Sequence, residues 1–164
     1  MFKKIVLASA ILCGGVIAQE VPITGNVESK CIVQTDTIGI YGNPTPSSLT
    51  TMSTGGGVTP IVRFDVIQAS FYKARITTPN GFSESPALSD VVTWTGDVAV
   101  GEVSDANMSA YSTSKVVYDN TTEIDLTIAG STWFNITSTA DYGYDTALPA
   151  GTYRAVVSAE CIAL

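Results

Sequence analysis

Apolar and polar side chains alternate along several stretches of this chain, and one of these stretches lies at its C-terminus. In residues 153–161, the side chains of Arg154, Ser158 and Glu160 separate positions that are apolar. Successive side chains of a strand point to opposite faces of a sheet, so this pattern predicts a strand with one apolar face. The apolar face carries Tyr153, Ala155, Val157, Ala159 and Cys161. Such a strand needs neighbours that pair with its backbone N–H and C=O groups.

Other short runs with the same alternation recur between turn-forming residues, and no stretch has a convincing helical period. The predicted strands are residues 19–28, 31–41, 62–66, 71–77, 91–100, 116–128, 131–137 and 153–161. Residues 42–60 contain three Pro and four Gly, and we expect them to form a loop, as we do for residues 101–112. This series of short strands predicts an all-β antiparallel sandwich.

The N-terminus has the features of a secretory signal peptide. Two lysines precede an apolar run that ends in Val16-Ile17-Ala18, a cleavage site of small residues. We therefore expect residues 1–18 to be removed and the chain to be exported. The apolar run is too short to span a bilayer, so no transmembrane anchor is expected. Residues 19–164 contain no sign of a domain boundary.

Charge and composition exclude several classes of function. The chain has 8 Lys and Arg against 15 Asp and Glu, and an acidic protein is poorly suited to bind nucleic acid. It has no His and no Gly-x-Ser-x-Gly motif, so no serine has the usual activating base. The carboxylates are scattered singly, which favours neither a glycosidase pair nor a calcium loop. We expect no catalytic residue, no cofactor and no metal site.

Two cysteines remain after the signal peptide, Cys31 near the start of the mature chain and Cys161 near its end. Cysteine pairs in exported proteins usually form disulfides, and both residues lie on the apolar side of their predicted strands. A Cys31–Cys161 disulfide would therefore join the first and last strands. The alternative is a pair of buried free thiols.

The segment before Cys31 also alternates, with Val21, Ile23, Gly25 and Val27 on one face. This segment, the cysteine after it and the closing strand introduced by Leu148-Pro-Ala-Gly-Thr-Tyr153 resemble the corresponding parts of chaperone–usher fimbrial subunits. The alpha-type, or alternate, branch and the spore coat protein U-like domains are the most similar. The resemblance covers the mature chain in length and strand pattern, and its specific motifs lie at the two ends.

The resemblance implies an immunoglobulin-like sandwich that lacks one strand. Its groove would be filled first by a strand of a periplasmic chaperone and then by the N-terminal segment of the next subunit, delivered by an outer-membrane usher. Here residues 19–28 would be the donor strand, and residues 29–164 the sandwich domain. Val21, Ile23 and Val27 would fill pockets, and Gly25 would lie where the groove is tight. The acceptor edge would carry Tyr153, Ala155, Val157 and Ala159.

These features favour a structural subunit of an adhesive surface fimbria that polymerises with copies of itself or related subunits. The alternative is a self-complete monomeric sandwich, secreted or periplasmic, that binds carbohydrate or serves adhesion. Two departures from the family keep this alternative open. The segment before Cys31 is short enough to serve as the domain's own first strand, and the familiar subunits bridge their first two strands instead.

Overall fold

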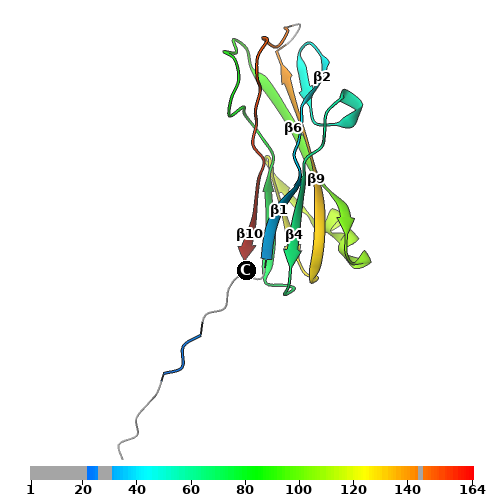
Figure 1. Cartoon of the computed structure of the whole chain (residues 1–164), viewed down its shortest axis with the longest axis vertical. Helices are drawn as coiled ribbons and strands as arrows, with labels where there is room; N and C mark the ends of the chain where they lie inside the picture. Colours follow the sequence, from blue (N-terminus) through cyan, green and yellow to red (C-terminus); the bar gives the residue numbers. More distant parts are fainter. Residues whose placement is uncertain (1–21, 26–30, 144–145) are drawn as a thin grey trace, which may run out of the picture.

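Two antiparallel sheets that face each other form most of the chain that the computed structural model describes, which is residues 22–25, 31–143 and 146–164 (Figure 1). The predicted all-β sandwich is confirmed. We call the end where β1 begins and β10 ends the lower end, and the end that carries β2 and β3 the upper end, as drawn in Figure 1.

The first sheet is built around one long strand. Its members are β1 (Cys31–Thr37), β2 (Gly42–Thr45), β3 (Ser48–Thr50), β4 (Ile61–Val66), β6 (Val92–Val103) and β9 (Gly130–Tyr142). β9 is central: β6 pairs along one side, while β4 and β3 pair with its lower and upper parts on the other side. β1 pairs only with β4 and is therefore an edge strand.

The second sheet has the order β10-β5-β8-β7. Its strands are β5 (Tyr72–Thr77), β7 (Val116–Tyr118), β8 (Thr121–Leu126) and β10 (Ser158–Ala163). β10 is an edge strand, and its pairing with β5 begins where Ser158 faces Thr77. Above that point, the described residues join across this sheet at one isolated bridge, Glu84 with Arg154.

Apolar side chains fill the sandwich most completely in its lower half. Phe64 and Phe134 are fully buried and meet edge to face, with ring centroids 5.6 Å apart. The remaining fully buried aliphatic side chains of this cluster include Ile76, Val98 and Ile136. In the upper half, the buried residues include Thr50, Thr51 and Ser138.

Three segments differ from the sequence-based prediction. The expected loop 42–60 contains the β2–β3 hairpin and a short 3-10 helix, η1 (Ser53–Gly55). The expected loop 101–112 holds the end of β6, the whole of a second 3-10 helix, η2 (Ala106–Ala110), and the start of α1 (Tyr111–Ser114). The last strand begins at Ser158 rather than at Tyr153, because residues 155–157 run past the end of β5 and have no strand partner.

Candidate binding groove

A disulfide closes the lower part of the seam between the two sheets. It joins Cys31, the first residue of β1, to Cys161 in β10, with the two Cα atoms 6.2 Å apart. This confirms the predicted pairing of the two cysteines. Val33, Val157 and Ala159 lie close by and pack against the core. The two edge strands therefore meet here without room for another strand between them.

Above the disulfide, the seam opens into a groove between residues 35–41 and residues 153–157. A cavity of about 360 Å³ is lined by Thr37 and Gly39 on one side and by Ala155 and Val157 on the other. A second cavity, of about 540 Å³, shares Gly39 and Ala155 with the first and extends to Tyr153. The groove therefore continues from the middle of the sandwich towards its upper end, which is the end that carries β2 in Figure 1.

The backbone of the two walls is hydrogen-bonded on the outside of the groove. On one wall, Ile40 exchanges N–H···O bonds of 2.9 and 2.8 Å with Val58, on the side where β4 pairs with β1. On the other wall, the N–H of Arg154 donates to Glu84 at 2.9 Å. Within the described chain, no backbone–backbone hydrogen bond involves residues 155–157. Backbone groups of alternate residues in a strand point to opposite edges, so those of Ala155 and Val157 are directed towards the groove.

Half-buried side chains on the wall after Gly151 follow the predicted parity. Tyr153, Ala155, Val157 and Ala159 are each partly covered, while the residues between them are exposed. The ring of Tyr153 contacts Phe82 at 5.1 Å between centroids, and its hydroxyl donates to the carbonyl of Pro149 at 2.7 Å. The four predicted acceptor-edge residues thus lie along the seam, three of them above the disulfide and Ala159 beside it.

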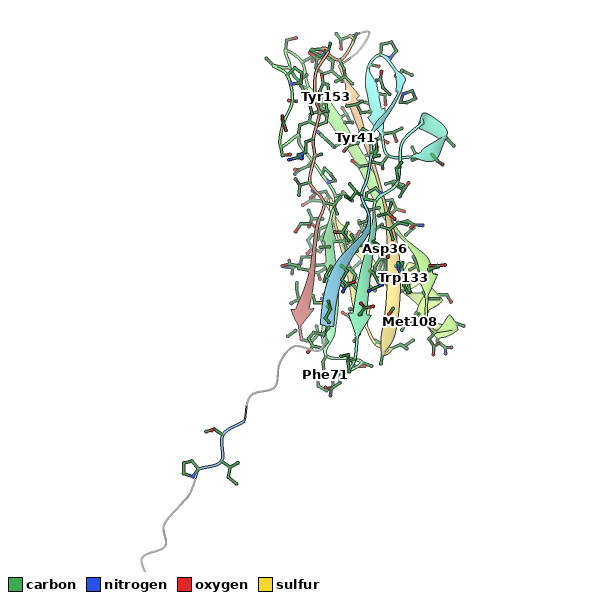
Figure 2. All side chains as sticks on the ribbon, in the orientation of Figure 1. Asp36, Tyr41, Phe71, Met108, Trp133 and Tyr153 are labelled. Carbon is green, nitrogen blue, oxygen red and sulfur yellow. A yellow bond between two sulfur atoms is a disulfide. The ribbon has the colours of Figure 1, made fainter. Side chains whose placement is uncertain are left out.

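Phe82 is the centre of an aromatic cluster under this wall. Its ring contacts Trp94 at 4.7 Å and Tyr41 at 6.5 Å in addition to Tyr153. Figure 2 shows Tyr41 and Tyr153 in the upper half of the molecule. The sequence analysis did not identify Phe82, because it lies in an irregular stretch after an Asn-Gly turn where no alternation marks a buried position.

Hydroxyl groups form the floor of the groove. The Tyr41 hydroxyl and the Ser138 hydroxyl are 2.9 Å apart, and burial raises the pKa of Tyr41 above its ordinary value. The backbone N–H of Ser138 donates to Thr51 Oγ1 at 2.9 Å, and that hydroxyl donates back to the Ser138 carbonyl at 3.4 Å. The floor is therefore internally satisfied, and contact with further apolar side chains would leave no buried polar atom unpaired.

The predicted donor residues lie outside the sandwich or outside the described residues. The side chain of Ile23 is 97 % exposed, and a Cβ placed on Gly25 would meet no atom within 4 Å. Val21 and Val27 belong to the residues that the structure does not describe.

Within the described residues, no cluster of three or more Cys, Asp or Glu side chains is arranged to hold a metal ion. The helices in that part of the chain are all too short to cross a bilayer. Comparisons with protein-family models, with curated proteins and with solved structures give no match.

Proposed function

We propose that this chain is a structural subunit of an adhesive bacterial surface fimbria, in which the N-terminal peptide of one copy fills the groove of the next. The observation that supports this most is the open groove, one wall of which has no backbone–backbone hydrogen bond over residues 155–157 in the described chain. An added strand would pair with this wall, and its alternate side chains would fill the cavities. A periplasmic chaperone would cover the same groove before assembly at an outer-membrane usher.

The donor segment suits this groove in its side chains. Val21, Ile23 and Val27 lie on one face of residues 19–28, so all three would point into the sandwich when the segment is extended. The exposed apolar Ile23 loses contact with water on insertion, and burying such a side chain stabilises a complex by roughly 1.5–3 kcal/mol.

The disulfide favours donation to another copy over insertion into the same copy. A strand between two others requires them to be about 9.5 Å apart, twice the usual spacing of paired strands. The Cα atoms of Cys31 and Cys161 are 6.2 Å apart, so no strand fits between them. A peptide that precedes Cys31 directly would have to pass this closed point to reach its own groove, whereas the upper part of a neighbour's groove has no such barrier.

The test uses the mature protein and its Ile23→Asp variant, with Thr24→Asp as the matched control on the opposite face. We expect the wild type and Thr24→Asp to form fibres visible by electron microscopy, and Ile23→Asp to remain monomeric. A synthetic peptide of residues 19–28 should bind to protein that lacks this segment, and the same peptide with Ile23→Asp should not. If the shortened protein is unfolded, or if all three proteins stay monomeric at every concentration, the proposal is wrong.

A second candidate is a self-complete monomer that binds carbohydrate. A separate cavity of about 430 Å³ is lined by Trp94 together with Asn80, Asp119 and Asn120. An aromatic ring beside amide and carboxylate groups can contact the apolar face of a sugar and hydrogen-bond its hydroxyls. Glycan binding that is lost in Trp94→Ala, in a protein that sediments as a monomer, would favour this candidate over the fimbrial subunit.

A further inference from the structure

Three exposed apolar side chains lie together at the lower end of the sandwich. Ile67 is 68 %, Phe71 53 % and Leu164 70 % exposed. Ile67 and Phe71 belong to the connection between β4 and β5, and the N–H of Leu164 donates to the carbonyl of Phe71 at 3.0 Å. Figure 2 shows Phe71 at this end of the molecule. We call these three residues the lower patch.

The N-terminal tail starts from the same end. Cys31 pairs with Val66, the residue before Ile67, so the tail joins the sandwich next to the lower patch. If residues 19–28 form the donor strand, only Ser29 and Lys30 separate it from Cys31. The three peptide steps from Glu28 to Cys31 span at most about 11 Å. The lower end of the donating copy must therefore lie close to the point where its tail enters the neighbour.

The disulfide closes the lower end of the neighbour's groove, so we place the end of the donor strand that leads to Cys31 at the upper end of that groove. The upper mouth of the groove is a cavity of about 240 Å³, lined by Pro46, Leu148 and Pro149. The N–H of Leu148 donates to the carbonyl of Pro46 at 2.8 Å, which links Leu148 to the turn between β2 and β3. We call these three residues the upper rim.

We infer that the lower patch of one copy docks on the upper rim of the next copy, so that each subunit contact has a second part beside the inserted strand. This inference rests on the proposed function, which places the tail in the neighbour's groove. The occupant of the lower patch is then a second copy of this chain, because the short link leaves no room for another partner. The lower patch is exposed and apolar, and the upper rim presents the exposed Pro46 beside the half-buried Leu148 and Pro149, so their contact removes hydrophobic area from water. The contact is head to tail and does not close on itself, which suits a filament.

The experiment compares fibre formation by the mature wild type with that by Phe71→Asp and, as a second variant of the patch, Ile67→Asp. Val117→Asp is the matched control, because Val117 is similarly exposed (56 %) but lies on β7, at the far edge of the second sheet. We expect both patch variants to need at least tenfold more protein for half-assembly, and Val117→Asp to assemble as the wild type does. The double variant Phe71→Asp with Leu148→Lys should recover part of the lost assembly, because each introduced Asp would meet an introduced Lys of the next copy.

Binding of the synthetic peptide 19–28 distinguishes this inference from the proposed function. Each patch variant, shortened to remove its own tail, should bind the peptide within about twofold of the shortened wild type. Patch variants that bind the peptide and also assemble like the wild type would overturn the inference and leave the proposed function standing. Failure of the wild type both to bind the peptide and to assemble would overturn both.

Discussion

The lower and upper halves of the sandwich bury different kinds of side chain. In the lower half, phenylalanines and branched aliphatic residues fill the space between two regular sheets, and Phe64, Phe134 and Ile136 are completely buried. In the upper half, Thr51 and Ser138 are buried and hydrogen-bond to each other, and among the described residues the second sheet is joined there by one isolated bridge. The seam is closed by a disulfide below and is open above.

This difference indicates what each half contributes. A closed, apolar lower half supplies most of the hydrophobic stabilisation and keeps the edge strands in place. The upper half has a pre-formed groove with unpaired backbone edges, which is the kind of surface that another strand can complete. The candidate binding groove thus lies where the chain's own strands do not pair along the edge of the sandwich.

Removal of the disulfide should have the largest effect on the closed half. The bridge joins residues separated by 130 positions, and a loop of that length constrains the unfolded chain by about 4–5 kcal/mol in the loop-entropy description. We expect the variant with Cys31→Ser and Cys161→Ser to lose roughly this amount of unfolding free energy, measured by urea denaturation of both proteins. The same variant opens the lower seam, so it should also form fewer fibres as tails enter their own grooves. Unchanged stability would show that the closed lower seam does not depend on this bond.

A truncation in the lower core should cost more than one on the groove wall. Phe134 is fully buried against Phe64, and Phe134→Ala should reduce the unfolding free energy by about 3–5 kcal/mol through lost contacts and a cavity. Tyr153→Ala removes a half-buried ring at an open groove, so we expect a smaller loss in the shortened protein. The losses of unfolding free energy in the two variants should become more similar once peptide 19–28 is bound. Unfolding curves recorded with and without the peptide measure this change. Equal costs without the peptide would contradict the comparison between the halves.

Alternation in the sequence predicted the lower half well. The runs 62–66 and 71–77 correspond closely to β4 and β5, and Cys31 and Cys161 meet because both lie on the inner face of their strands. In a regular sheet, one face of each strand is buried along its whole length, so the alternation of apolar residues shows which face of the strand points into the core.

The upper half was harder to predict, because its structure depends on contacts that leave no periodic pattern. The β2–β3 hairpin lies in a stretch rich in Gly, Pro and hydroxyl residues, and Thr50 and Thr51 are buried although their side chains are polar. Alternation in residues 153–157 predicted the correct inward face but also a paired strand. Pairing depends on whether a neighbour is present, which the sequence of one strand does not encode.

The hydroxyl floor of the groove should contribute less than the apolar core. Thr51→Val keeps the shape of the side chain but leaves the buried N–H of Ser138 without its acceptor. We expect a loss of about 1–3 kcal/mol, the usual cost of an unsatisfied buried donor. Thr24→Val is a control substitution of the same kind, outside the sandwich, and should change the unfolding free energy of monomeric protein very little. A loss no larger than that of the control would show that water or another group replaces Thr51.

The smallest effect should come from a charged cluster on the outer face of the lower half, and it should depend on pH. Glu123 accepts hydrogen bonds from Lys73 at 2.9 Å, Tyr118 at 2.8 Å and Arg75 at 2.8 Å, and these lower the pKa of Glu123 from 4.5 to about 2. Because the folded pKa lies below the unfolded one, the stabilisation is complete above pH 4.5 and is lost as the pH falls towards 2. Glu123→Gln should therefore be less stable than the wild type at pH 7, and the urea midpoints of the two proteins should converge near pH 2.

Asp125→Asn is the matched control. The Asp125 side chain is 63 % exposed and lies 3.9 Å from Lys73 Nζ, and surface pairs of this kind contribute about 0–1 kcal/mol. Peptide binding in the groove should be unaffected by Glu123→Gln at pH 7, because the cluster lies on the outer face of β5, β7 and β8 and none of its side chains lines the groove cavities. A gap between the two midpoints that stays constant down to pH 2 would contradict this assignment, because it would mean that Glu123 acts through packing rather than through its charge.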